Sequence, residues 1–270
     1  MRFDLIALDL DDTLLHSDLS ISEANRAALR AAHRGGAKIV LASGRNIYSM
    51  EKYARLLGLD GRDDYIISTN GAEIVETSTA RVLEETRMGA GLCREVAAAV
   101  EARGFPWQVY GKGVIYYRGE NPWTQEDTRL TGMPNEPLTD LAAALDGGQL
   151  KFIVPGDPDL LPALRLELLT HFSGRVEVFI SKPYFLEVLC AGVDKGRTLV
   201  DLARLLGIPL ARTLALGDAM NDLGMIREAG FSCAPANSVP DVKAAAKWVS
   251  PLTNDQDFVA DAIRRWMDLP

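Results

Sequence analysis

The chain opens with a short apolar segment that leads directly into acidic residues. Residues 3–12 read FDLIALDLDD, and the uninterrupted apolar run ends at Leu8. A run of this length and composition predicts a buried strand from Phe3 to Leu8. The sequence therefore predicts a first strand whose carboxyl end carries two aspartates, Asp9 and Asp11.

Strands and helices then alternate on both sides of a central segment. After the first strand, helices are predicted over 23–33 and 46–57, and strands over 38–42 and 65–68. Near the end of the chain, strands are predicted over 213–216 and 231–234, and helices over 199–206, 221–228 and 256–267. Alternation of this kind indicates right-handed βαβ units and a parallel sheet.

The central segment has a different rhythm. Two short strands, 107–110 and 114–118, flank Gly111-Lys112-Gly113 and predict a hairpin. Further helices are predicted over 92–103 and near 159–171, and further strands over 151–154, 175–180 and 184–189. The overall prediction is an α/β protein with a Rossmann-like parallel-sheet core. Residues 1–82 and 190–270 would form that core, and residues 83–189 would form an inserted α+β cap domain.

The composition indicates which binding partners and which cellular compartment to expect. The chain has 270 residues and a formal net charge of -8, so it repels nucleic acid and anionic membranes in general. Cys93, Cys190 and Cys233 are odd in number and widely spaced, which indicates a reducing compartment. The charged N-terminus does not read as a signal peptide, and no apolar stretch approaches the roughly 20 residues of a membrane span. We therefore expect a cytoplasmic protein that binds neither nucleic acid nor membrane.

Chemically distinctive side chains follow several of the predicted strands. They are Asp9 with Asp11, Ser43, Asn70 and Asp218. Ligand sites in open α/β sheets lie at the carboxyl ends of the strands, so these groups are expected to converge. Two carboxylates spaced as Asp9 and Asp11 stay ionised together only near a cation such as Mg²⁺. Each of these residues could instead have a purely structural role. Asp9 and Asp11 could lie in a solvated acidic loop, and Ser43 and Asp218 could cap helices. Lys195, which precedes Gly196 after the central segment, could be a surface charge.

Five short motifs together resemble those of the haloacid dehalogenase superfamily, most closely its Cof-type phosphatases with a large inserted cap. The motifs are Asp9-Leu10-Asp11-Asp12-Thr13-Leu14-Leu15, Ala42-Ser43-Gly44-Arg45, Thr69-Asn70-Gly71-Ala72, Lys195-Gly196 and Gly217-Asp218-Ala219-Met220-Asn221-Asp222. They cover both halves of the predicted core in the family's order. Two positions depart from the family pattern, because Asp12 and Phe258 stand where glycine is usual.

The resemblance implies a mechanism and a role for each motif residue. Asp9 would attack phosphorus to form an aspartyl-phosphate, and Asp11 would act as the general acid and base. Mg²⁺ would be held by the carboxylates of Asp9 and Asp218 and by the backbone carbonyl of Asp11. The phosphate would be bound by Ser43, Gly44, Lys195 and Asn221, while Asp222 would orient Lys195 or metal-bound water.

Residues with less defined roles are also implied by the resemblance. Arg45 would contact substrate or anchor its loop, and Asn70 and Asn237 would contact substrate or stabilise turns. In the cap, substrate choice would be made by side chains among Trp107, Tyr110, Tyr116, Tyr117, Trp123, Lys182 and Tyr184, although aromatic residues also commonly pack a domain core.

The expected activity is hydrolysis of a small phosphorylated metabolite, either a sugar phosphate or a phosphorylated cofactor. One alternative is a phosphotransferase or phosphomutase, because the same base can activate a sugar hydroxyl. A non-catalytic phospholigand-binding protein on the same fold is a second alternative. A receiver domain, which also carries a phosphorylated aspartate, would be about half this length. The sequence leaves the oligomeric state open between monomer and dimer.

Overall fold

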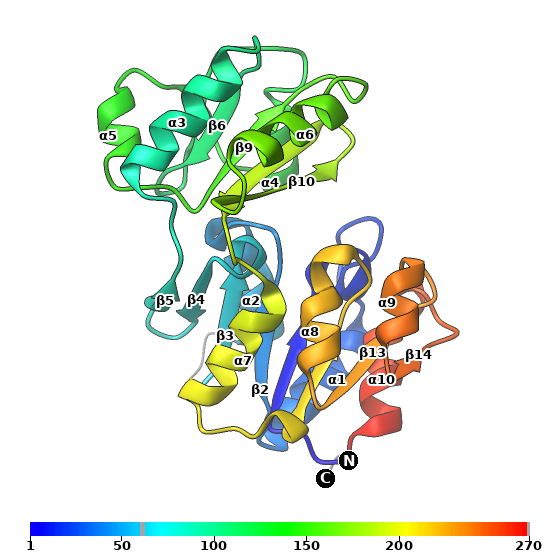
Figure 1. Cartoon of the computed structure of the whole chain (residues 1–270). Helices are drawn as coiled ribbons and strands as arrows, with labels where there is room; N and C mark the ends of the chain where they lie inside the picture. Colours follow the sequence, from blue (N-terminus) through cyan, green and yellow to red (C-terminus); the bar gives the residue numbers. More distant parts are fainter. Residues whose placement is uncertain (60–62, 269–270) are drawn as a thin grey trace. The chain divides into compact units, whose positions relative to one another are not determined.

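The computed structural model describes residues 1–59 and 63–268 (Figure 1). The chain divides into two compact units. The first, here called the core, comprises Met1–Glu85 and Asp194–Pro270, and the second, here called the cap, comprises Thr86–Val193. The predicted fold class, a Rossmann-like core with an inserted α+β domain, is confirmed.

The core is built on one sheet with the strand order β14-β13-β12-β1-β2-β3-β4-β5. Its strands are β1 (Leu5–Leu8), β2 (Lys38–Ala42), β3 (Tyr65–Ser68), β4 (Glu73–Glu76), β5 (Arg81–Glu85), β12 (Thr213–Leu216), β13 (Phe231–Ala234) and β14 (Trp248–Val249). Pairing is parallel from β14 to β3, whereas β4 and β5 are antiparallel. Leu8 is in register with Leu216 on one side and Leu41 on the other, so β1, β2 and β12 end at one edge of the sheet.

Helices cover both faces of the core sheet (Figure 1). Alternate residues of β1 supply the two faces: Ile6 and Leu8 pack into one apolar cluster, and Leu5 and Ala7 pack into another. The first cluster includes α1 (Glu23–Arg34), α2 (Ile47–Leu57) and α10 (Phe258–Trp266), and the second includes α7 (Lys195–Leu205), α8 (Leu223–Glu228) and α9 (Pro240–Ala245). Burial of both faces explains why these strands are continuously apolar.

The cap has its own sheet and its own apolar core. Its strand order is β10-β11-β9-β6-β7-β8, and it is antiparallel except between β7 and β8. The elements are α3 (Ala90–Glu101), β6 (Trp107–Tyr110), β7 (Ile115–Arg118), α4 (Glu126–Thr131), β8 (Asn135–Pro137), α5 (Leu141–Leu145), β9 (Lys151–Pro155), α6 (Leu161–His171), β10 (Val176–Lys182) and β11 (Phe185–Cys190). One sheet face packs against α3, α5 and α6, and the predicted hairpin of β6 and β7 is present.

Several elements differ from the sequence-based expectation. Helix α7 begins at Lys195, four residues before the predicted start, because Asp194 caps it by accepting a hydrogen bond from the Arg197 N–H. Strands β4 and β5 were not predicted, and neither were the short elements α4, α5, α9, β8 and β14. Among the described residues, no helix is long and apolar enough to cross a membrane. The three cysteines are free thiols.

Helices α7 and α8 approach closely at two glycines, and we expect this contact to be intolerant of added volume. A Cβ on Gly196 would lie 2.2 Å from the backbone carbonyl carbon of Gly224. We expect Gly196→Ala to lower the free energy of unfolding by about 1–3 kcal/mol, because the two backbones would have to separate. Urea denaturation measures this change.

Gly91→Ala, in α3, is the matched control, because a Cβ added at Gly91 would have no neighbouring atom within 4 Å. Alanine there is expected to leave stability unchanged or to raise it by about 0.5–1 kcal/mol. Equal stability of wild type and Gly196→Ala would contradict the close packing of α7 on α8.

Candidate active site

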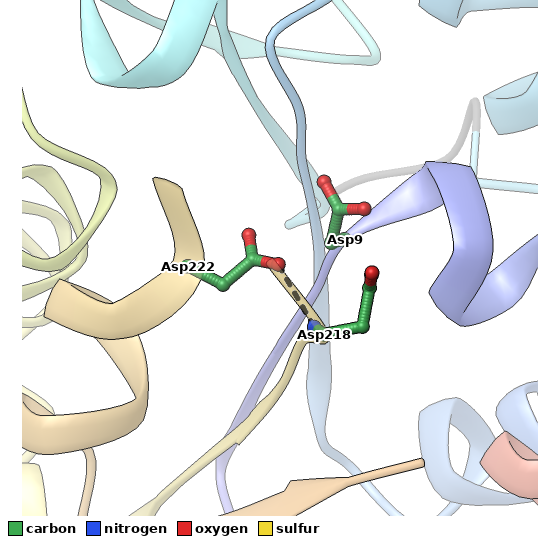
Figure 2. A group of neighbouring side chains, drawn as sticks. All are labelled: Asp9, Asp218 and Asp222. Atoms are coloured by element: carbon green, nitrogen blue, oxygen red, sulfur yellow. Dashed lines mark hydrogen bonds between the residues drawn. The ribbon is translucent and has the colours of Figure 1, made fainter. Parts of the chain in front are cut away.

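The predicted polar residues come together at the carboxyl edge of the parallel strands. Asp9 follows β1, Ser43 follows β2, and Asp218 lies two residues after β12. Carboxylate oxygens of Asp9, Asp218 and Asp222 lie within 4.8 Å of one another, as Figure 2 shows for their side chains. These residues are far apart in sequence, and the common edge of the sheet is what brings them together.

Lys195 is the cation of this cluster. It is the first residue of α7, its side chain is fully buried, and its Nζ donates to Asp9 Oδ1 and to Asp222 Oδ1, both at 2.6 Å. Burial alone would lower the pKa of Lys195, but the charges of Asp222 and Asp9 outweigh it and raise that pKa. Lys195 therefore stays an ammonium ion in contact with the predicted nucleophile.

The Asp222 carboxylate holds Lys195 and the turn at Asp218 in place through hydrogen bonds. Oδ1 accepts from Lys195, and Oδ2 accepts from the backbone N–H of Ala219 at 3.0 Å. Oδ2 also accepts from the backbone N–H of Asp218 at 2.9 Å, the bond drawn in Figure 2. This carboxylate is fully buried. Its position fits the predicted role of orienting Lys195, and its hydrogen bonds also fix the turn that presents Asp218.

Asp218 is oriented by a residue that the sequence analysis did not assign. Thr13 donates its hydroxyl to Asp218 Oδ1 at 2.6 Å. Thr13 lies in a tight turn over Leu10–Leu14, in which Asp12 has a left-handed φ of 59°. The presence of Thr13 in the first motif was visible in the sequence, but its bond to Asp218 spans 205 residues and carries no local signal.

The charge balance of the cluster fits a divalent cation. Three buried carboxylates, Asp9, Asp218 and Asp222, face one ammonium, which leaves two negative charges in a low-dielectric environment. Burial, followed by the charge of Asp222, raises the pKa of Asp9 well above its usual range and that of Asp218 to about 7. Hard oxygen ligands with this charge suit Mg²⁺, and Asp9 and Asp218 are the residues that would hold it.

Asp11 lies outside this cluster and is paired with Arg45. Arg45 donates from Nε to Asp11 Oδ2 at 2.8 Å and from a terminal nitrogen to Asp11 Oδ1 at 2.6 Å. The two charges balance each other, so this pair adds no net charge to the site. The Asp11 side chain is not among the carboxylates that gather as candidate metal ligands.

The loops after β2 and β3 are joined by polar contacts. Asn70 donates its backbone N–H to the Ser43 carbonyl at 2.9 Å, and its Oδ1 accepts from Asn221 Nδ2 at 3.0 Å. A Cβ on Gly44 would lie 2.9 Å from Asn70 Oδ1, so a larger residue there would have to displace the Asn70 amide. In the structure, the side chains of Asn70 and Asn221 therefore support the Ser43–Gly44 turn.

The remaining predicted residues have other surroundings. Asn237 donates from Nδ2 to the Asp12 carbonyl at 2.8 Å and accepts from the Asn254 N–H at 3.0 Å, which ties the chain's closing segment to the Asp9 motif. Lys182 is exposed on cap strand β10, and Trp107 is fully buried in the cap core. Phe258 is likewise fully buried, in the core cluster under α10.

Comparison with known proteins identifies the family. Residues 6–263 match the family model described as haloacid dehalogenase-like hydrolase. The chain is 31% identical to the putative phosphatase YxeH of Bacillus subtilis over 97% of both chains. It is 29% identical to the 5-amino-6-(5-phospho-D-ribitylamino)uracil phosphatase YcsE of the same organism, over 97% of this chain and 95% of that protein.

Comparison with a solved structure supports the same family assignment. A haloacid dehalogenase-like hydrolase from Bacteroides thetaiotaomicron superposes with a TM-score of 0.91 at 32% identity, over 98% of this chain and 99% of that chain. The chain belongs to the haloacid dehalogenase-like hydrolase family. Within it the chain is an enzyme of the phosphatase type, as the sequence motifs predicted.

Metal binding and protonation are expected to compete at Asp218. Because the pKa of Asp218 is raised to about 7, the metal-free fold favours the protonated carboxyl below that pH, and its ionisation destabilises the fold as pH rises toward that value. Added Mg²⁺ would relieve this cost. We expect the Mg²⁺-induced rise in melting temperature to be small near about pH 5.5 and to grow through about pH 8, measured by thermal denaturation.

Asp218→Asn should lose most of the Mg²⁺ response at every pH, whereas Asp241→Asn, an exposed residue of α9, should keep it. A wild-type response that does not change with pH, or one that persists in Asp218→Asn, would contradict this assignment.

Proposed function

We propose that this enzyme is a Mg²⁺-dependent phosphatase that hydrolyses small phosphorylated metabolites through a phosphorylated Asp9. The observation that carries the proposal is the buried contact of Lys195 Nζ with Asp9, within a carboxylate cluster that has two excess negative charges. A nucleophilic carboxylate needs to stay ionised next to an anionic substrate. The Lys195 ammonium favours that state, and a cation bound by Asp9 and Asp218 would offset the burial and the carboxylate charges that oppose it.

In the first step, an Asp9 carboxylate oxygen attacks phosphorus and the bond to the leaving oxygen breaks. Asp11 supplies the proton that the departing alkoxide needs, since such an oxygen is a poor leaving group at neutral pH. Lys195 balances charge at Asp9 during this step. The divalent cation, when bound by Asp9 and Asp218, would shield the anionic nucleophile from the anionic substrate.

In the second step, water attacks the phosphorus of the Asp9 phosphate. Asp11, now a carboxylate, accepts the proton of that water, and the bond between Asp9 and phosphorus breaks to release inorganic phosphate. Ser43 and the backbone of Gly44 lie at a strand-to-helix turn where N–H groups favour anions, so we place the phosphate there. Asn221 supports this turn through Asn70.

For the substrate, we propose a phosphate ester of a hydroxylated metabolite, either a sugar phosphate or a phosphorylated cofactor. The relative YcsE is named for a substrate that carries its phosphate on a ribityl chain. We also propose a reducing compartment such as the cytoplasm, because the fold uses none of its three cysteines in a disulfide.

The proposal is tested by phosphate release from a panel of sugar phosphates and phosphorylated cofactors with and without Mg²⁺. Asp9→Asn keeps the shape of the side chain but removes the nucleophile, and we expect its kcat to fall by at least about 10³-fold. Asp159→Asn, exposed in the cap, is the matched control and should retain full activity.

Two outcomes would redirect the proposal. Transfer of phosphate to an acceptor alcohol in preference to water, detected by product analysis, would favour a phosphotransferase. Tight binding of a panel compound without turnover in wild type would favour a binding protein. Activity retained in Asp9→Asn would overturn the role of Asp9 itself.

A further inference from the structure

The ion pair between Arg45 and Asp11 has a geometry that fixes a carboxylate in one orientation. Two separate N–H donors of one planar guanidinium meet the two oxygens of Asp11, at 2.8 Å and 2.6 Å. A fork of this kind restrains both side-chain torsions of the aspartate, which a single donor such as lysine does not do. The Asp11 side chain is about one-third exposed, so burial alone does not fix its conformation. The two hydrogen bonds from Arg45 provide that restraint.

Arg45 is itself held rigidly from three directions. Its carbonyl accepts from the Thr69 N–H at 2.8 Å, and its own N–H donates to Ser43 Oγ at 3.2 Å. Its guanidinium carbon lies 5.6 Å from the ring centroid of buried Tyr53, and its side chain is only 12% exposed. With its backbone anchored to both turns and its guanidinium beside an aromatic ring, Arg45 can restrain its partner carboxylate.

These contacts point to a third role for Arg45, beside the substrate contact and the loop anchoring that the family resemblance implied. A substrate ligand would present its planar fork to the phosphate or the leaving group. In this structure Nε and a terminal nitrogen of Arg45 both face Asp11. We propose that Arg45 is a positioning residue that holds Asp11 in the orientation needed to pass a proton between leaving group, water and enzyme. This inference rests on the proposed function, in which Asp11 is the acid and base.

The inference predicts an effect that depends on the leaving group. A substrate that releases an alkoxide needs the proton of Asp11 in the first step, whereas 4-nitrophenyl phosphate releases a stable phenolate and does not. Water activation in the second step needs Asp11 for both substrates. Loss of positioning should therefore slow the first step only for alkyl phosphates, and the second step for all substrates.

The experiment compares Arg45→Met and Arg45→Lys with wild type on two substrates, a sugar phosphate and 4-nitrophenyl phosphate. We expect kcat/KM for the sugar phosphate to fall by about 100-fold, because misplacing a catalytic group costs on this order. For 4-nitrophenyl phosphate, kcat/KM should stay within about 3-fold of wild type, while its kcat falls. A rapid burst of 4-nitrophenolate, close to one equivalent per active site, should precede the slow steady state.

Two control variants separate the possible failures. Asp11→Asn should reproduce the pattern of Arg45→Met, because both remove the oriented proton carrier. If wild type is inactive, or if Asp11→Asn shows no leaving-group dependence, the proposed function fails. Arg55→Met, which breaks an exposed ion pair with Glu51 on the same helix, should match wild type on both substrates.

Other results would overturn the inference alone. If Asp11→Asn is selective for the leaving group but Arg45→Met raises KM equally for both substrates, Arg45 is a substrate ligand. Retention of wild-type kinetics in Arg45→Met would show that Asp11 needs no such support. If Arg45→Met does not fold, Arg45→Lys decides the question, because it keeps the charge but cannot form the fork.

Discussion

The buried ammonium of Lys195 is the interaction on which the rest of the site depends. It joins the end of β1, the start of α7 and the turn before α8 through two hydrogen bonds of 2.6 Å. Without it, three buried carboxylates would face one another, and at least one would have to take up a proton. Because Lys195 and Asp222 are both completely buried, their charges are poorly screened and their positions are tightly constrained.

Much of this arrangement could be predicted from sequence, because parallel strands have one carboxyl edge. Asp9, Ser43 and Asp218 each follow an apolar run that predicts a buried strand, and their convergence follows from the topology. The side-chain pairings could not be predicted in the same way. Thr13 with Asp218 and Asn237 with Asp12 depend on rotamers and on contacts across more than 200 residues, which leave no local pattern.

Several of the elements that sequence reasoning missed lack a sequence pattern long enough or regular enough to detect. Strand β5 has mainly exposed residues and no alternation of buried and exposed positions, so it carries no period-two signal. Strand β14 has two residues, and α5 has five, which is too short for a helical period to show. Helix α1 was recognised because its 12 residues have helical composition between a capping serine and glycines, and β1 because its four residues are all apolar and all buried.

The two departures from the family pattern have local explanations in this structure. Asp12 takes a left-handed φ of 59°, a conformation that favours glycine, yet Asn237 donates a hydrogen bond to its carbonyl and holds the turn in place. Asn254 in turn fixes Asn237 and also donates to the Leu15 carbonyl. Phe258, immediately after this closing segment, is the first residue of α10 and is completely buried in the core cluster that α10 shares with α1 and α2. The apolar anchor at Phe258 and the amide pair at Asn237 and Asn254 therefore hold one segment, and within it the hydrogen bond from Asn237 supports the turn at Asp12.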